Sequence, residues 1–94
     1  MSWVVYILRC SDHSYYVGHT ANVKERLLAH DSGLGPTYTA KRRPVKLVYV
    51  EFADSKALAT KREKQLKRWS QAKKEALING DVEQLHELSR RRRN

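Results

Sequence analysis

Two β-forming runs near the N-terminus, separated by a short polar turn, are the feature that most constrains the fold. Residues 3–9 (WVVYILR) are rich in β-branched and aromatic side chains, and residues 15–18 (YYVG) continue that composition after four turn residues. This arrangement predicts a β-hairpin. A third run, at residues 45–52 (VKLVYVEF), alternates in the same way and predicts one more strand.

Helical spacing occupies most of the remaining chain. Asn22 is followed three positions later by Glu25, which approximates a capping box, while Ser70 and Gly80 suit the start and stop of a further helix. Helices are expected at residues 22–32, 55–69 and 71–79, with a last one at 81–88. The order ββαβαα(α) predicts an α+β fold, in which helices flank a small three-stranded mixed or antiparallel sheet.

The length of 94 residues allows one domain with one modest core. We expect a catalytic-sized unit over residues 1–80 and a C-terminal helix with a basic arginine tail over residues 81–94. The chain carries 19 Lys and Arg against 10 Asp and Glu, a net charge of +9, which favours a polyanionic partner. Four of these charges are the arginines at 90–93, expected to be a disordered tail, so the rest keeps +5.

The apolar runs are far shorter than the ~20 residues that a membrane helix needs. The first residues also lack the basic start and cleavage site of a signal peptide. A single cysteine, Cys10, cannot form an internal disulfide and fits a reducing compartment, so we expect a cytoplasmic protein in which Cys10 simply packs.

Two short motifs on the predicted hairpin resemble the signatures of a known superfamily. Val4-Val5-Tyr6 resembles a relaxed GIY element, and Tyr16-Val17-Gly18 resembles YIG. Together with Arg26 on the first helix and Glu63 on the second, they are similar in order to the GIY-YIG nucleases. The resemblance covers residues 3–78 and is greatest to the small single-domain bacterial type, which is related to the catalytic domain of the excision-repair incision subunit.

The resemblance implies a divalent-metal-dependent endonuclease that hydrolyses phosphodiester bonds in DNA, with a role in DNA repair or processing. Tyr6 would then be the general base. A free phenol has a pKa of about 10, so Tyr6 needs nearby positive charge, which Arg26, His19 or a metal ion could supply. Taken alone, Tyr6 would be read as a tyrosine that packs the strand.

Tyr16 would hold the scissile phosphate or tune Tyr6, provided that both side chains lie on one face of the hairpin. A two-residue turn at positions 12–13 would pair Tyr6 with His19 and put Tyr16 on the other face. A shared face therefore predicts a loop of odd length or a bulge, with Tyr15 packing in the core. Gly18 would allow backbone or phosphate to approach closely.

Arg26 and His30 are four residues apart and share a helix face. Arginine can grip two phosphoryl oxygens at once, although an isolated helical arginine is also a common surface residue. The resemblance implies that His30 positions water or orients a tyrosine, and capping the helix end is the alternative. His19 stands where relatives often carry lysine, which leaves open whether a permanent charge is needed there.

Glu63 is the only carboxylate in the run KREKQLKRW. The resemblance implies that it is a ligand for Mg²⁺ or Mn²⁺, with phosphate oxygens and waters completing the shell. Its spacing alone favours an i,i+4 ion pair with Lys67 instead. Many relatives have a downstream asparagine, and Asn79 is the only nearby candidate, but no role is transferred to it.

Eight basic residues are expected to bind the nucleic-acid backbone, with little sequence preference. They are Lys41, Arg42, Arg43, Lys46, Lys61, Lys64, Lys67 and Arg68. The segment 36–44 that holds the first three is expected to be a loop, and Trp69 is expected to belong to the core. DNA is favoured over RNA, a protein partner could supply specificity, and monomer and homodimer both stay open. The rival interpretation is a basic nucleic-acid-binding or ribosome-associated protein in which catalysis is weak or lost.

Overall fold

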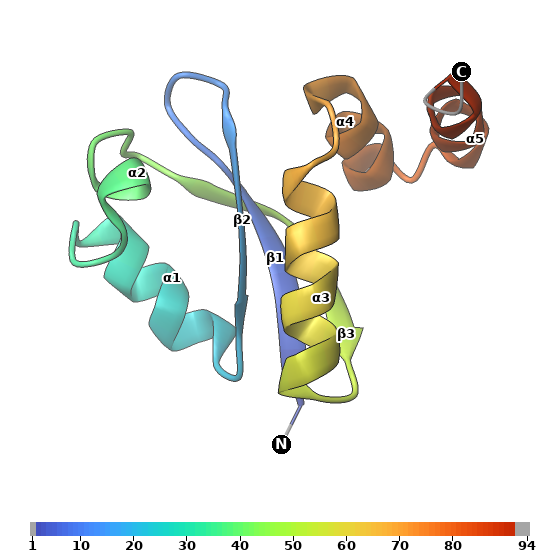
Figure 1. Cartoon of the computed structure of the whole chain (residues 1–94). Helices are drawn as coiled ribbons and strands as arrows, with labels where there is room; N and C mark the ends of the chain where they lie inside the picture. Colours follow the sequence, from blue (N-terminus) through green and yellow to red (C-terminus); the bar gives the residue numbers. More distant parts are fainter. Residues whose placement is uncertain (1, 92–94) are drawn as a thin grey trace.

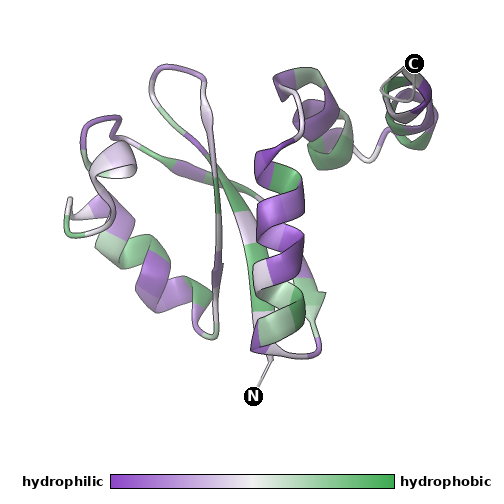
Figure 2. Ribbon diagram, in the orientation of Figure 1, coloured by the Kyte–Doolittle hydropathy of each residue, from purple (hydrophilic) through white to green (hydrophobic). Residues whose placement is uncertain are grey.

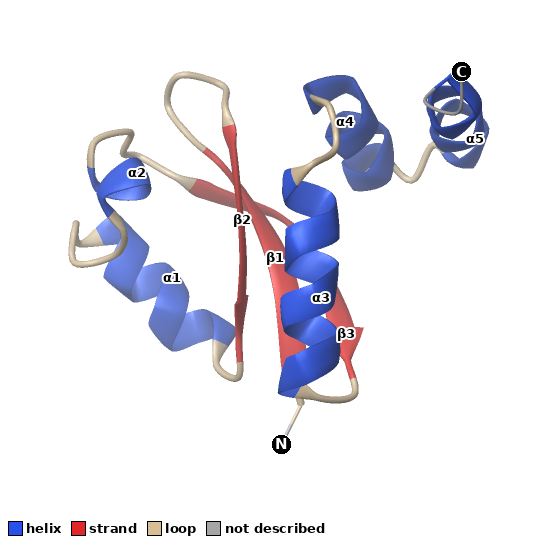
Figure 3. Cartoon of the chain, in the orientation of Figure 1, coloured by secondary structure: helices blue, strands red, loops and turns tan. Residues whose placement is uncertain are grey.

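The computed structural model describes residues 2–91 and has an antiparallel three-stranded sheet with helices on both sides (Figures 1 and 3). The strands are β1 (Trp3–Arg9), β2 (Tyr15–Thr20) and β3 (Lys46–Ala53), in the order β2-β1-β3. The helices are α1 (Val23–Asp31), α2 (Thr37–Ala40), α3 (Lys56–Lys67), α4 (Gln71–Asn79) and α5 (Val82–Arg91). The α+β architecture expected from the sequence is confirmed, and the sheet is purely antiparallel.

The hairpin has the odd-length loop that a shared tyrosine face requires. Tyr6 pairs with Gly18 and Leu8 pairs with Tyr16, and the Cys10 amide donates to the Ser14 carbonyl across a three-residue loop. The last loop residue, His13, has a φ of 68°, in the left-handed region that such loops commonly use. Because side chains alternate along a strand, this register puts Tyr6 and Tyr16 on the same face.

Each face of the sheet carries its own apolar cluster. Val5, Ile7 and Val17 pack with Ala59 and Leu66 of α3 on one face. On the other face, the members are Tyr6, Leu8, Cys10 and Val45, with Tyr16, Leu27 and Leu47 at their edge. Green, hydrophobic stretches follow β1, while α3 is green over its first turns and purple, or hydrophilic, over its middle (Figure 2). Because β2 is an edge strand, polar groups from both faces can meet around it.

The helix boundaries follow the expected caps. The Asn22 side chain accepts a hydrogen bond from the Glu25 amide, and Ser70 accepts one from the Lys73 amide. Gly80 ends α4 with a φ of 70°. The sequence did not predict α2, because residues 36–44 were expected to be a loop.

The C-terminal helix, α5, extends further than the expected residues 81–88. It runs through Arg91, so the first two arginines of the terminal run are helical and the disordered tail expected at residues 90–93 is wrong for them. Arg90 forms an ion pair with Glu87. Residues 92–94 lie outside the described part of the chain. Within that part, no helix is long and apolar enough to span a membrane.

Candidate active site

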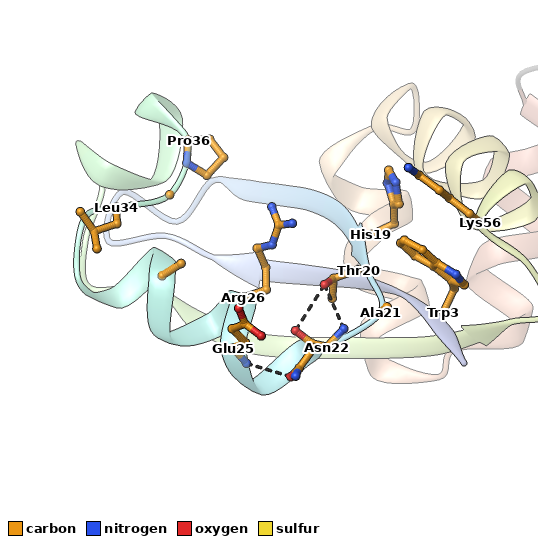
Figure 4. A pocket seen from close by; sticks show the side chains of 12 residues that line it. Trp3, His19, Thr20, Ala21, Asn22, Glu25, Arg26, Leu34, Pro36 and Lys56 are labelled. Carbon is orange, nitrogen blue, oxygen red and sulfur yellow. Dashed lines mark hydrogen bonds between the residues drawn. The ribbon is translucent and has the colours of Figure 1, made fainter. Parts of the chain in front are cut away.

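A groove of about 850 Å³ lies beside β2, the edge strand, between α1 and the start of α3 (Figure 4). Arg26 of α1 reaches into it from one side, and Trp3, His19 and Lys56 lie together on the other (Figure 4). The tyrosines lie on one face of the sheet, and His19 and α3 lie on the other. The groove runs along the edge strand β2, so it borders both faces.

Tyr6 occupies space that a side chain at position 18 would fill. A Cβ added to Gly18 would come within 2.6 Å of the Tyr6 Cζ atom and still closer to the hydroxyl oxygen. Gly18 is directly opposite Tyr6 in the hairpin, so the hydroxyl end of the phenol lies against the glycine. Gly18 therefore leaves the room that the Tyr6 ring needs to reach His30 of α1.

A chain of hydrogen bonds runs inward from Tyr6. Its hydroxyl lies 3.0 Å from His30 Nε2, and His30 Nδ1 lies 2.7 Å from the Thr39 hydroxyl oxygen. Thr39 in turn donates its only hydroxyl proton to the Pro36 carbonyl, at 3.1 Å. With Thr39 as the donor to Pro36, its oxygen accepts from His30 Nδ1–H, and the neutral imidazole then has its lone pair on Nε2, toward Tyr6. His30 is thus held in the tautomer that accepts a proton from Tyr6.

Burial determines the charge states in this chain. Tyr6 is 3% exposed, and burial, followed by the neighbouring Tyr16, raises its pKa well above that of a free phenol. Arg26 lowers the Tyr6 pKa, as expected, but the effect of burial is larger. His30 is fully buried, and burial followed by Arg26 lowers its pKa. The resting pair is a neutral phenol and a neutral imidazole.

Tyr16 completes an aromatic cluster on this face. Its ring centroid lies 6.5 Å from that of Tyr6 and 5.2 Å from that of His30. Burial raises the Tyr16 pKa, while Lys67, whose Nζ lies 5.9 Å from the ring centroid, lowers it. Tyr38 of α2 packs on the far side, at 6.0 Å from Tyr16. The expected meeting of Tyr6, Tyr16 and His30 is present in the structure.

Arg26 is the exposed cation of the site. Its guanidinium makes no hydrogen bond or ion pair within residues 2–91, and it lines the groove (Figure 4). It does not pair with Asn22, Glu25 or Asp31, the surface partners that were the alternative. The guanidinium is therefore available to an anion that enters the groove.

Glu63 lies on the α3 side of β2. Its Oε1 is 2.7 Å from His19 Nδ1, and its Oε2 is 3.1 Å from Lys67 Nζ. His19 is paired with Val5 in the hairpin and so faces α3 rather than the tyrosines. The i,i+4 pair with Lys67 that the spacing suggested is present, together with a histidine contact that the sequence did not indicate.

Glu63 is the carboxylate that the resemblance assigns to a metal ion, while Glu25 lines the groove on the α1 side. Within residues 2–91 no three His, Cys, Asp or Glu side chains gather in a way that could hold one. Mg²⁺ at phosphoryl sites commonly uses one or two carboxylates, with substrate oxygens and waters as the other ligands. The donor set fits an ion of that kind, provided that it displaces Lys67 from the carboxylate.

Some of the basic residues expected at the nucleic-acid surface form hydrogen bonds or ion pairs within the protein, and others do not. Arg42 donates to Asp12 and to the Tyr38 carbonyl, and Arg43 donates to the Ala40 and Asp31 carbonyls, so both guanidinium groups are held within the fold. Lys67 is held by its pair with Glu63. The side chains of the others make no such interactions with described residues. They are Lys41, Lys46, Lys61, Lys64 and Arg68.

The sequence did not indicate that α2 contributes side chains to the site. Thr39 is fully buried and fixes His30, and Tyr38 packs on Tyr16 beneath the Arg42 guanidinium, 3.9 Å from the Tyr38 centroid. In the sequence this segment stands out for its charges. The only further signal is two threonines and a tyrosine between Pro36 and the basic residues, too little to predict packing against α1.

Comparison with known proteins agrees with this geometry. Residues 2–76 match the GIY-YIG catalytic domain family, which is most of the described chain. The chain therefore belongs to the GIY-YIG family.

Similar proteins share nearly the whole unit. A UPF0213 protein of Natronomonas pharaonis is 49% identical over 74 residues, covering 79% of this chain and 87% of the relative. One from Syntrophus aciditrophicus is 49% identical over 82 residues, covering 86% and 94%. The solution NMR structure of the UPF0213 protein BH0048 from Bacillus halodurans is 41% identical with a TM-score of 0.55, and covers 86% of each chain. That of the protein EF2693 from E. faecalis is 38% identical with a TM-score of 0.60, and covers 85% of each.

Proposed function

We propose that this chain is a divalent-metal-dependent endonuclease that hydrolyses phosphodiester bonds in DNA, in repair or processing. The observation that carries the proposal is the 3.0 Å contact between the buried Tyr6 hydroxyl and His30 Nε2, beside Tyr16 and Arg26. The unpaired Arg26 in the adjacent groove is the group that an anionic substrate requires.

Tyr6 acts as the general base by taking a proton from water while its own hydroxyl proton passes to His30. Because burial raises the Tyr6 pKa and lowers the His30 pKa, a free phenolate beside an imidazolium is unfavourable, and the two transfers occur together across the 3.0 Å contact. The oxygen of that water forms the new bond to phosphorus. The bond from phosphorus to the leaving oxygen breaks, that oxygen takes a proton from solvent, and His30 releases the proton it holds to solvent. Arg26 lies close enough to favour negative charge on the Tyr6 oxygen.

Arg26 and Tyr16 stabilise the charge that develops on the phosphoryl oxygens. A guanidinium can donate two parallel hydrogen bonds to a phosphate, and the Tyr16 hydroxyl can donate a third. Burial keeps Tyr16 protonated, which is the state in which it donates. Tyr6 and Tyr16 therefore have different roles although their pKa values shift in the same direction.

Glu63 would hold Mg²⁺ or Mn²⁺, and His19 would orient the carboxylate through its 2.7 Å hydrogen bond. When bound, such an ion supplies positive charge to the phosphoryl oxygens. Lys67 occupies the second carboxylate oxygen in the free protein and can turn to a phosphate when that oxygen is needed.

The nucleic-acid surface combines the groove with the free cations of α3. Lys61, Lys64 and Arg68 have side chains without partners among the described residues, and they follow one another at helical spacing. Lys41 and Lys46 would extend this surface near the hairpin. Arg42 and Arg43 would contribute mainly charge, because hydrogen bonds from Nε and Nη1 hold each guanidinium within the fold.

The experiment is a cleavage assay with Mg²⁺ on single-stranded, branched and duplex DNA, and on RNA of the same sequence. The proposal predicts cleavage that is abolished by chelation and by Glu63→Ala. Cleavage that survives both Glu63→Ala and Tyr6→Phe would identify a contaminant and refute the proposal. Preferential cutting of RNA would keep the chemistry and change the substrate.

One structural fact favours a second candidate, a nucleic-acid-binding protein without significant catalysis. In the free protein Tyr6 is a neutral phenol and both oxygens of Glu63 are occupied, so neither group is in its reactive state. Salt-dependent DNA binding with no cleavage under any divalent metal would support this candidate.

A further inference from the structure

The wall of the groove opposite α1 carries a tryptophan that the chemistry above does not use. Trp3 is half-buried at the start of β1, and its ring centroid lies 5.8 Å from that of His19, with 41° between the planes. The Lys56 ammonium lies 5.6 Å from the same centroid. Figure 4 shows Trp3, His19 and Lys56 side by side on this wall.

This wall is directly connected to the carboxylate. The histidine that touches Trp3 also holds Glu63, through the 2.7 Å hydrogen bond between Nδ1 and Oε1. On the opposite wall, the unpaired Arg26 guanidinium points into the same groove (Figure 4). A phosphate at Arg26 and a planar group at Trp3 would therefore belong to neighbouring parts of one ligand.

The residues that line the groove indicate which class of ligand it would bind. It offers an aromatic surface, an ammonium above it and a guanidinium across from it, and Glu25 is the only acidic residue among its lining. Aromatic side chains beside a positive groove bind single-stranded nucleic acid by stacking on its bases. A base inside a duplex already stacks on both sides and cannot offer its face in this way.

We infer that Trp3 is a stacking site for an unpaired nucleobase next to the scissile phosphate, with Lys56 bound to that nucleotide's own phosphate. The inference rests on the proposed function, and it identifies the substrate as a single-stranded or locally unpaired segment. On binding, the base takes the place of the Lys56 ammonium over the indole ring.

Trp69, the other tryptophan of the chain, lies away from this wall. It follows the C-terminal end of α3 and packs at the edge of the core, while Lys56 begins that helix. Arg62 and Lys73 lie 5.2 and 4.2 Å from its ring centroid, so its ring already has two cationic neighbours. The groove does not include Trp69.

The test measures binding without cleavage, in the Tyr6→Phe protein and in the absence of divalent metal. Trp69→Phe leaves Trp3 as the only tryptophan, so stacking is read as quenching of its fluorescence. The probes are DNA and RNA single strands of one length, the DNA duplex, and an abasic sugar-phosphate strand of equal charge. Trp3→Leu removes the aromatic ring but keeps apolar volume, and Trp3→Phe restores an aromatic ring.

We expect base-containing single strands to quench Trp3 and the abasic strand not to. Trp3→Leu should weaken single-strand binding by about 5- to 150-fold, the loss that one stacked base produces, and Trp3→Phe should recover most of it. The strand with the larger loss, DNA or RNA, is the ligand. Equal affinity of Trp3→Leu and the parent for both strands, with Trp3→Leu shown to be folded by circular dichroism, would overturn the inference. If a strand quenches Trp3 but is never cut by the protein with Tyr6 intact, the stacking site is supported and the nuclease proposal is refuted.

Discussion

The Tyr6 hydroxyl and His30 Nε2 lie 3.0 Å apart between a central strand and the helix that covers it, where both side chains are almost entirely buried. Each partner depends on a small or polar neighbour: Tyr6 needs the bare backbone of Gly18, and His30 needs the Thr39 hydroxyl. Substitutions at these two neighbours therefore test the arrangement without removing the reacting groups.

Gly18→Ala should displace the Tyr6 ring and break its hydrogen bond to His30, because the new methyl would overlap the phenol. We expect about 1–3 kcal/mol lower free energy of unfolding, as for other overpacked sites, together with loss of cleavage. Gly80→Ala is the control. It strains a φ of 70° but has no atom within 4 Å, so it should lower stability and leave cleavage unchanged. Full activity of Gly18→Ala would show that the position of Tyr6 does not matter.

Thr39→Val should leave His30 Nδ1–H without an acceptor in a buried site, at a cost of about 1–3 kcal/mol. The tautomer would no longer be fixed, and the cleavage rate should fall roughly 10- to 100-fold, the range for partners that orient histidine ligands. Thr39→Ser keeps the hydroxyl and should restore both the stability and the cleavage rate. The ¹⁵N chemical shifts of His30 report the tautomer directly, and an unchanged tautomer in Thr39→Val would contradict this role.

Acidification should lower both activity and stability through His30. Burial and Arg26 lower the pKa of His30 in the fold, while Asp31 opposes them, so the native state binds fewer protons here than the unfolded chain. The stability due to neutral His30 is complete above its ordinary pKa of about 6.5 and is lost as pH falls through the lowered native value.

Cleavage should follow the same acid limb, because only neutral His30 can accept the Tyr6 proton. Urea titrations and rates between about pH 5 and 8 check both effects. The exposed His13 provides the control, since His13→Gln should keep the wild-type profile. Activity that is constant down to the pH of unfolding would exclude His30 as the acceptor.

Removal of the α3 cations should weaken binding in a salt-dependent way. For the triple variant Lys61→Ala, Lys64→Ala, Arg68→Ala, the slope of log affinity against log salt should decrease by about 0.7–0.9 for each phosphate that is no longer neutralised. Arg43→Lys is a useful comparison, because Arg43 is engaged with carbonyl groups and its charge is kept. An unchanged slope in the triple variant would show that other cations bind the nucleic-acid backbone.

The part of this site that could be predicted is the part encoded by local sequence. Strand-forming runs and caps such as Asn22 defined the elements, because alternation and capping act within a few residues. The need for Tyr6 and Tyr16 to share a face predicted the odd-length hairpin loop, which the register confirms. Glu63 was identified by family position and not by its spacing.

The parts that could not be predicted depend on packing between distant segments. Thr39 meets His30 only because α2 folds back on the end of α1, and no periodicity in residues 36–44 indicates this. His19 was one candidate for the positive charge near Tyr6, but the register turns it to the other face, against Glu63. Burial, which determines the charge of Tyr6, is likewise a property of the whole fold.

The single-turnover rate of Mg²⁺-dependent cleavage by Tyr6→Phe tests the central claim most directly. Phenylalanine keeps the ring beside Gly18 and removes only the hydroxyl that His30 accepts from. Tyr49→Phe is the matched control, because that hydroxyl donates to Glu51 on β3, away from the groove. We predict that Tyr6→Phe cleaves about 10²- to 10⁴-fold more slowly with DNA affinity retained, while Tyr49→Phe keeps the parent rate. Equal rates for Tyr6→Phe and the parent would contradict the account.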